Sequence, residues 1–372
     1  MHVLVTTDTL SSVWTHTREL VSGLINRGVR VTLVSFGDIP LAYQTKWMDS
    51  LQNLDYRPTA FRLDWMQDGQ QDFEDSSRYL ASLIKELKPD LLHLNQLCHG
   101  ALPVDVPRVA VAHGDLITWW LGVHGREPAP TPWLRWYREV IRRGIEEATM
   151  LVAPSSWMLD LIRENYGSPA RSTIVYVGRN PIFFNPYVSK HGYALAVGRM
   201  VDPARQVSLL TKYSHSVPVC IVDSDGQPTD PDVTVSADVK LKVDDANLSL
   251  KGPQTETQMR TLYSRAGIFV AASRYDPLGL SMLEAAFSRC AIVANDVPCH
   301  REIWGDAAIY FQENDAESLA DVIHRLHQQP DLCKGYAARA FQRARDQFTA
   351  SRMVDNYIEL YSRVLKTQAV AA

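Results

Sequence analysis

Two acidic side chains, Asp276 and Glu284, stand eight residues apart in the segment SRYDPLGLSMLEAAFSRCAIVAND, residues 273–296. The apolar run before this segment predicts a strand, and the residues after Gly279 predict a helix. Asp276 therefore falls in the turn and Glu284 in the helix, on the side that follows the turn. Because a carboxylate accepts two hydrogen bonds from adjacent hydroxyl groups, the spacing favours Asp276 on a sugar and Glu284 on a ribose. The alternative is a helix with Asp276 near its cap and Glu284 in solvent.

The backbone amides at the start of this helix could bind phosphate. The N–H groups of Gly279, Leu280 and Ser281 come from a turn and a first helical turn, where no intrahelical carbonyl accepts them. The helix dipole also favours negative charge at this end. Together with the two acids, these amides predict a diphosphate site.

Basic and imidazole side chains follow two other predicted strands. Arg199 comes directly after the strand in ALAVGRMVDPARQVSLL, residues 194–210, and Arg205 follows six residues later. A guanidinium can bind phosphate through two parallel hydrogen bonds, although most surface arginines are simply solvated. His113 follows the strand in VAVAHGDLITWWLGVHG, residues 109–125. A lone histidine is more often structural, but its position at the carboxyl end of a strand favours a functional role.

The segment DTLSSVWTH, residues 8–16, lies where a nucleotide-binding protein has its phosphate loop, between an apolar run and a segment of helical spacing. Such loops use glycine, because the backbone must turn with positive φ and approach a phosphate closely. Ser11 and Ser12 stand at these positions. Three interpretations are open: a phosphate loop that has drifted, a loop retuned for another ligand, or no such loop.

The elements that must position these residues alternate between short β-type runs and longer segments of helical period, which predicts parallel sheets flanked by helices. The length of 372 residues fits two domains. A connector, GRNPIFFNPYVSKHG at residues 178–192, separates two series of strands. The expected strands are His2–Val5, Arg30–Ser35, Asp90–Leu94, Arg108–Ala112, Met150–Ala153, Thr173–Val177, Tyr193–Val197, Val217–Val222, Asn247–Leu250, Ile268–Ala272, Ala291–Ala294 and Ala308–Phe311. The expected helices of the second series are Ala204–Tyr213, Glu256–Ala266, Leu280–Arg289 and Glu317–His327. Two doubly wound domains should therefore face one cleft, with ligands beyond the carboxyl ends of the strands.

Composition excludes several classes of protein. Apolar residues at 46%, charged residues at 22% and a net charge of −4 are typical of a globular protein without an electrostatic case for binding nucleic acid. Five cysteines, an odd number without a C-x-x-C pair, suit reduced thiols in the cytosol and argue against zinc. No signal peptide and no membrane-spanning run is evident. We expect a cytoplasmic protein.

The segment around Asp276 resembles family 4 of the retaining GT-B glycosyltransferases. The signature of that family is usually written E-P-F-G-L-x-x-L-E-A, and this chain reads D-P-L-G-L-S-M-L-E-A. Other blocks agree in order over nearly the whole chain. The resemblance implies an α/β GT-B fold with two Rossmann-like domains: an acceptor-side domain at 1–180, a nucleotide-sugar-binding domain at 181–345, and a C-terminal helix at 346–372 that crosses back to the first.

The resemblance also implies roles for individual residues. Arg199 matches the arginine, and Arg205 the lysine, of a block that clamps the donor diphosphate. His113 matches a histidine that contacts the donor sugar. Ser11 and Ser12 align with two glycines whose amides approach the donor phosphate and sugar, and a serine hydroxyl can itself donate to phosphate.

This chain departs from the family pattern around the same site. Asp276 is one methylene shorter than the usual glutamate, Leu278 replaces a phenylalanine, and Asp223 and Asp225 add carboxylates after a strand. Added carboxylates repel a diphosphate unless they are paired or turned away. Because the changes cluster at the donor site, an alternative hypothesis is a family member that has lost turnover and acts as a binding or partner subunit.

Two further segments carry alternatives. Asp223 and Asp225 form a D-x-D pair of the kind that holds a divalent ion in a different glycosyltransferase fold, but the run DSDGQPTDPD favours a solvated turn, and we expect no metal. The helix expected in TPWLRWYREVIRRG, residues 131–144, could contact a lipid surface through tryptophan and arginine, or could simply face the core.

These features predict a metal-independent, retaining enzyme that moves a hexose-like sugar from a nucleoside diphosphate donor to an unidentified acceptor, with no further cofactor. Arg199, Arg205 and the helix amides would stabilise charge on the departing diphosphate, Glu284 would hold the ribose, and Asp276 and His113 would orient the sugar. In retaining members the acceptor attacks from the leaving-group face and a phosphate oxygen takes its proton. Contact with a membrane surface and with a protein partner is left open.

Overall fold

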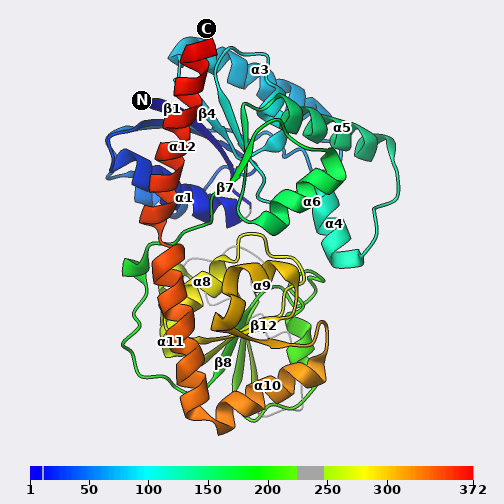
Figure 1. Cartoon of the computed structure of the whole chain (residues 1–372), viewed down its shortest axis with the longest axis vertical. Helices are drawn as coiled ribbons and strands as arrows, with labels where there is room; N and C mark the ends of the chain where they lie inside the picture. The colour runs from blue at the N-terminus through cyan, green and yellow to red at the C-terminus, as the bar shows by residue number, and fades with distance from the viewer. Residues whose placement is uncertain (11, 224–246, 372) are drawn as a thin grey trace. The chain divides into compact units, whose positions relative to one another are not determined.

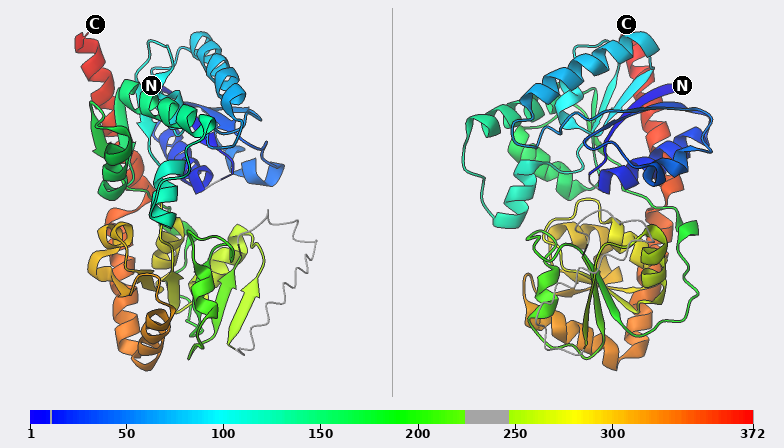
Figure 2. Two further views of the ribbon diagram at one scale, coloured as in Figure 1. Left: turned by 90° about the vertical axis from the view of Figure 1, so that its right-hand side faces the viewer. Right: turned by 180° about the vertical axis from the view of Figure 1, so that it is seen from behind.

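Each half of the chain builds one parallel β-sheet with helices on both faces (Figures 1 and 2). The computed structural model describes residues 1–10, 12–223 and 247–371. The chain divides into unit 1, made of Met1–Gly178 and Ala350–Ala372, and unit 2, made of Arg179–Thr349. Within the described residues, no helix combines the length and the apolar character that crossing a membrane requires.

Unit 1 has a seven-stranded sheet in the order β3-β2-β1-β4-β5-β6-β7. Its strands are β1 (His2–Asp8), β2 (Arg30–Phe36), β3 (Leu54–Pro58), β4 (Leu91–Leu94), β5 (Arg108–Val111), β6 (Met150–Ala153) and β7 (Ser172–Ile174). Its helices are α1 (Ser12–Ile25), α2 (Ala42–Thr45), α3 (Gln70–Leu87), α4 (Leu116–His124), α5 (Pro132–Glu147), α6 (Ser156–Tyr166) and α12 (Ala350–Ala371), with short 3₁₀ turns at Lys46–Met48 and at Leu97–Ala101. The strand order reverses between β1 and β4, which is where open α/β sheets bind ligands.

Unit 2 has a six-stranded sheet in the order β10-β9-β8-β11-β12-β13. Its strands are β8 (Ala194–Val197), β9 (Val219–Val222), β10 (Leu248–Lys251), β11 (Ile268–Ala271), β12 (Ala291–Asn295) and β13 (Ala308–Phe311). Its helices are α7 (Glu256–Arg265), α8 (Leu280–Phe287), α9 (Pro298–Trp304), α10 (Ala316–Gln328) and α11 (Pro330–Gln347), with 3₁₀ turns at Pro181–Phe183, Val207–Thr211 and Gly305–Ala307. The order reverses between β8 and β11, so this sheet also has a switch point.

One local expectation was wrong, and one strand was missed. The segment expected as a helix at Ala204–Tyr213 forms only the 3₁₀ turn Val207–Thr211, because Gln206 has a left-handed φ of +50° that interrupts an α-helix before it can form. The strand β3 was not expected, because its sequence LDYRP ends in proline and is only half-buried. An edge strand of this kind carries no continuous apolar pattern.

The last helix of the chain, α12, belongs to unit 1 and packs along α1 (Figure 1). The side chain of Val354 fills the space above Gly23, where an added Cβ would lie 2.4 Å from Val354 Cγ2. At the rim of this contact, Arg27 Nε donates to Asp355 Oδ1 at 2.7 Å. The absence of a side chain at Gly23 therefore allows α12 to pack closely against α1.

A second close approach in unit 1 joins α5 to the 3₁₀ turn at 97–101. A Cβ on Gly144 would lie 1.9 Å from the carbonyl oxygen of Leu97, and a Cβ on Gly100 would lie 2.0 Å from the carbonyl oxygen of Gly144. Backbone atoms cannot yield as a flexible side chain can. Both glycines are therefore required by sterics.

We expect Gly144→Ala to lower the free energy of unfolding by roughly 1–3 kcal/mol or more, because the new methyl group forces the backbones apart. The matched control is Gly335→Ala in α11, where the nearest atom to a new Cβ is Arg339 Nη1 at 3.7 Å. That substitution should stabilise by about 0.5–1 kcal/mol, since alanine replaces glycine inside a helix. Urea denaturation of both variants measures the effect, and equal signs would contradict the steric explanation.

Candidate functional site

Arg205 lies at the carboxyl edge of the sheet of unit 2, near the switch point between β8 and β11. The loop after β8 folds back on Gly198, where an added Cβ would come within 2.9 Å of Arg205 Cβ. The N–H of Arg274, in the segment that follows β11, donates to the carbonyl of Ala204 at 2.8 Å. The loop is thus tied to both strands of the switch point.

Asp276 pairs with this arginine. Arg205 Nη1 donates to Asp276 Oδ2 at 2.7 Å, and the N–H of Gly279 donates to Asp276 Oδ1 at 3.2 Å. The side chain of Asp276 is only 6% exposed and that of Arg205 is 30% exposed. The carboxylate raises the pKa of Arg205, so the guanidinium stays charged. The structure therefore brings two predicted site residues together and gives Asp276 the additional task of shaping the turn.

The turn leads into α8 through Gly279, whose φ of +57° lies in the left-handed region that glycine adopts without strain. The amides of Leu280 and Ser281 belong to the first turn of α8, where helical geometry provides no carbonyl partner. The acceptor at Asp276 covers only the amide of Gly279. These two amides lie at the N-terminus of α8, where the sequence predicts that an anion binds.

Glu284 is anchored inside unit 2. Arg179 Nη2 donates to Glu284 Oε1 at 2.8 Å, with the two side chains 4% and 17% exposed. Tyr263 of α7 shares side-chain hydrogen bonds with both Glu284 and Ser281. Burial, together with the charge of Glu284, raises the pKa of Tyr263 well above its usual range, so this phenol remains a hydrogen-bond donor. Glu284 is therefore a fixed carboxylate and not a solvated surface residue.

Arg179→Ala should reduce the free energy of unfolding by about 3–5 kcal/mol, because the substitution leaves the Glu284 carboxylate buried without its cation. The control is Arg260→Ala, which breaks a more exposed pair with Glu256 at 2.9 Å, with side chains 31% and 54% exposed. This control should cost at most about 1 kcal/mol. Chemical denaturation compares the two variants. A loss at Arg179 no larger than that at Arg260 would show that the buried pair is not what holds the first turns of α8.

Arg199 lies in the same loop as Arg205 but is exposed. The N–H of its neighbour Met200 donates to Asp223 Oδ2 at 3.5 Å, so one carboxylate after β9 lies beside this loop. Asp225, the second acid of the D-x-D pair, lies outside the described residues. Arg205 is therefore the arginine that the structure holds close to Asp276.

His300, at the start of α9, is a buried residue near Asp276 that sequence reasoning missed. Its Nδ1 is 3.0 Å from the carbonyl of Asn295, so this nitrogen carries the proton. In the described part of the chain its Nε2 is buried without a partner. Burial lowers the pKa of His300, while the nearby charge of Asp276 opposes that shift. The signal in the sequence was its place just after the carboxyl end of β12.

The predicted residues of unit 1 lie at the other switch point. Ser12 is the first residue of α1, directly after the loop that leaves β1, and Ser11 lies outside the described residues. His113 follows β5 and is 8% exposed, with Nε2 at 2.6 Å from Asn95 Oδ1. Asp115 caps α4 by accepting from the amide of Ile117 at 2.8 Å and from Tyr166 at 2.6 Å, which is a structural role.

His113 belongs to a group of buried imidazoles in unit 1. Its ring lies 4.7 Å from the ring of His16, and His93 reaches the same Asn95 with Nε2 at 3.2 Å from Oδ1. Burial lowers the pKa of His16 to about 3 and that of His93 to about 4, and it lowers the pKa of His113 well below its usual range. No group of three or more metal-binding side chains occurs among the residues that the structure describes. Because burial lowers the pKa values of His16, His93 and His113 so far, all three imidazoles are neutral at pH 7.

Unit 1 should lose stability as the pH falls below about 6.5. Unfolded histidines bind protons near pH 6.5, whereas His16 and His93 do so only near pH 3 and 4 when folded. Their stabilising contribution is thus complete above pH 6.5 and is lost toward the folded pKa values, at up to about 1.4 kcal/mol per pH unit for each histidine. Urea unfolding at pH 7 and pH 5 measures the loss.

Asp64 should affect the pH dependence of stability in the direction opposite to that of the histidines, and so it serves as a control. Burial raises its pKa to about 6, so its contribution to stability grows as the pH falls from 6 toward its unfolded value near 4. Asp64→Asn should therefore steepen the acid loss, and His93→Gln should make it shallower. An unchanged slope in both variants would contradict this assignment.

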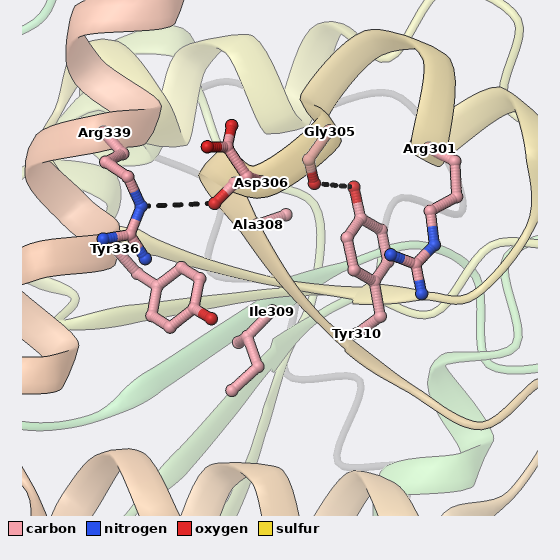
Figure 3. A pocket seen from close by; sticks show the side chains of 8 residues that line it. All are labelled: Arg301, Gly305, Asp306, Ala308, Ile309, Tyr310, Tyr336 and Arg339. Carbon is pink, nitrogen blue, oxygen red and sulfur yellow. Dashed lines mark hydrogen bonds between the residues drawn. The ribbon is translucent and has the colours of Figure 1, made fainter.

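A hollow of about 420 Å³ lies elsewhere in unit 2, beside the edge strand β13 (Figure 3). Arg301 stacks 3.7 Å over the ring of Tyr310, and Arg339 stacks 4.1 Å over the ring of Tyr336. Arg301 is already paired with Asp296 at 2.6 Å. None of the predicted site residues lines this hollow, so it is distinct from the candidate site.

The helix α5 matches the core-facing alternative. Its buried residues, which include Tyr137 and Ile141, pack in the core of unit 1, and Trp133 and Trp136 pack against the same cluster. Arg142 is paired with Glu139 at 2.7 Å and also with Glu146. Both tryptophans and Arg142 are thus engaged within the unit.

Comparison with known structures defines the class of protein. Sucrose-phosphate synthase from Thermosynechococcus elongatus superposes with a TM-score of 0.76 at 14% identity, over 99% of this chain and 100% of that chain. Anabaena HepE in complex with UDP-glucose superposes with a TM-score of 0.71 at 12% identity, over 98% and 100%. The fold is therefore the GT-B fold of glycosyltransferases.

Sequence comparison defines the family. A model described as Glycosyltransferase Family 4 matches residues 13–181, and one described as Glycosyl transferases group 1 matches residues 194–343. The chain belongs to glycosyltransferase family 4 and is a glycosyltransferase, as its motifs predict.

The curated relatives are distant. The chain is 25% identical to the alpha-maltose-1-phosphate synthase of Mycolicibacterium smegmatis over 305 residues, which is 73% of this chain and 76% of that protein. It is 23% identical to an O-antigen chain mannosyltransferase of Salmonella typhimurium over 214 residues, or 55% of this chain and 59% of that protein. It spans 56% of the corresponding synthase of Mycobacterium tuberculosis.

Proposed function

We propose that this protein transfers a hexose from a nucleoside diphosphate donor to an acceptor with retention of configuration and without a metal ion. The observation that carries the proposal is the placement of the Arg205–Asp276 pair beside the first amides of α8, at the switch point of unit 2. A cation and a helix N-terminus side by side suit two linked phosphates. In this proposal the guanidinium and the amides take the place that Mg²⁺ has in metal-dependent transfer.

The donor class is supported by the relatives. The neighbour HepE was solved with UDP-glucose, and the curated relatives include a maltose-1-phosphate synthase and mannosyltransferases. The sugars in these names are glucose, maltose and mannose, which are hexoses or are built from hexoses. We propose a hexose for this chain too, with Glu284 on the ribose and His113 on the sugar.

Catalysis then consists of stabilising the departing diphosphate. Arg205 and the amides of Leu280 and Ser281 act on the charge that develops on the phosphates as the sugar leaves. Asp276 accepts from only one nitrogen of Arg205, and a guanidinium has further N–H donors for a phosphate oxygen. A phosphate oxygen accepts the proton of the acceptor on the same face, so no side-chain nucleophile is required.

Arg205→Ala should weaken binding of the donor by about 10- to 100-fold, because a charge-assisted hydrogen bond to phosphate contributes about 1.5–3 kcal/mol. Arg260→Ala is the matched control, since its side chain is 31% exposed and also ion-paired, but lies on α7. Calorimetric titration with UDP-glucose and with GDP-mannose measures affinity in the presence and absence of EDTA. EDTA should have no effect.

Turnover is measured separately, by release of UDP or GDP and by the anomeric configuration of the product in proton NMR. An α-configured donor should give an α-configured product. Failure of both donors to bind the wild-type chain would overturn the proposal. Donor binding without hydrolysis or transfer would instead support the alternative of a homologue that binds but does not turn over.

A further inference from the structure

The side-chain amide of Asn95 lies at the centre of a buried hydrogen-bond network in unit 1. Asn95 follows the carboxyl end of β4 and is 8% exposed. Its Nδ2 is 2.7 Å from the carbonyl oxygen of Thr6 and 3.2 Å from Thr17 Oγ1. Because a carbonyl oxygen only accepts, the atom facing Thr6 must be the NH₂ group. The orientation of the amide is therefore determined, and Oδ1 faces the imidazoles.

This orientation determines the tautomer of His113. Oδ1 of Asn95 can only accept, and His113 Nε2 lies 2.6 Å from it, so Nε2 must carry a proton. A neutral imidazole has one N–H and one lone pair, so the lone pair of His113 is on Nδ1. Among the residues that the structure describes, this Nδ1 is buried and has no hydrogen-bond partner.

The tautomer of His93 is determined by the contacts of both its ring nitrogens. Its Nε2 lies 3.2 Å from Asn95 Oδ1, and its Nδ1 lies 2.7 Å from the hydroxyl of Tyr361 in α12. With Nε2 as donor, Nδ1 accepts from Tyr361. Every nitrogen of His93 is thus satisfied within the unit. His113 differs in having one acceptor left over, and a buried unsatisfied acceptor is costly unless a ligand or a water uses it.

We propose that Asn95 is a positioning residue, which holds His113 as the Nε2–H tautomer so that Nδ1 is the acceptor that His113 offers to a hydroxyl group of the donor hexose. The inference rests on the proposed function for the identity of the hydroxyl, but the tautomer is a property of the free protein. His113 then acts as a neutral hydrogen-bond acceptor, and neither as a general acid nor as a cation toward phosphate.

Long-range proton–nitrogen NMR of the ¹⁵N-labelled full chain without ligand tests the tautomer directly at pH 7. His113 and His93 should both show the Nε2–H pattern, assigned through His113→Gln and His93→Gln, whereas exposed His324 should show averaged signals. In Asn95→Leu, the pattern of His113 should shift toward Nδ1–H or become averaged. A wild-type His113 that carries its proton on Nδ1, or on both nitrogens, would overturn the inference whatever the protein binds.

Binding of UDP-glucose and GDP-mannose tests the use of the lone pair. The amide of asparagine reaches the level of Nδ1, and that of glutamine reaches the level of Nε2. His113→Asn should therefore keep affinity within about threefold of wild type, whereas His113→Gln and Asn95→Leu should lose about tenfold, the effect of one hydrogen bond. The reverse order of the two His113 variants would overturn the assignment of Nδ1.

These readouts also separate a merely structural role for Asn95. If Asn95→Leu lowers the melting temperature but leaves both the tautomer of His113 and the affinity unchanged, the positioning role is overturned. If neither donor binds the wild-type chain, the proposed function fails, while the NMR spectrum still decides the tautomer. If Asn95→Leu does not fold, the wild-type spectrum and the two His113 variants remain decisive.

Discussion

The ion pair between Arg205 and Asp276 is the interaction on which the proposed donor site of unit 2 depends. It joins the loop after β8 to the turn after β11, and so holds the two sides of the switch point together. The same carboxylate fixes the amide of Gly279 at the entrance to α8. An aspartate at this position, one methylene shorter than the usual family glutamate, is thus committed to shaping the site.

Two ion pairs of unit 2 join charged side chains that are largely shielded from water. Arg179 forms a second pair with Glu284 of α8, and both side chains are largely buried. A lone charge at such depth would be strongly destabilising, whereas a pair with good geometry holds both side chains in place. In unit 1 the same problem is solved without charge, because His16 and His93 are buried as neutral imidazoles. The buried polar groups of unit 2 are thus charged pairs, whereas those of unit 1 include neutral imidazoles.

Sequence patterns were sufficient to predict most strands and the residues that follow them, because these depend on local periodicity and on the direction of the chain. Strands of a parallel sheet end on one edge, so the amino-acid sequence alone singles out residues that follow strands, such as Arg205, Asp276 and His113. The pairing of Asp276 with Arg205 could not be predicted in this way, because the two are 71 residues apart and nothing in either segment specifies the other. The partners of Glu284 were missed for the same reason. The turn at Val207–Thr211 was misjudged because a left-handed Gln206 depends on tertiary packing and not on propensity.

The departures from the family pattern differ in the contacts that the new side chains make. Asp276, which stands where the family pattern has a glutamate, is held in a defined ion pair with Arg205. The added acid Asp223, which follows β9, makes a different contact. It accepts from the backbone amide of Met200, beside Arg199. Its negative charge therefore lies next to the loop that is proposed to bind phosphate. Two opposite charges near one loop lower its net attraction for an anion. In the proposed site Arg205 is therefore the main cation, and its charge is already paired with Asp276. Binding of a diphosphate there would depend on the amides of Leu280 and Ser281 as much as on charge.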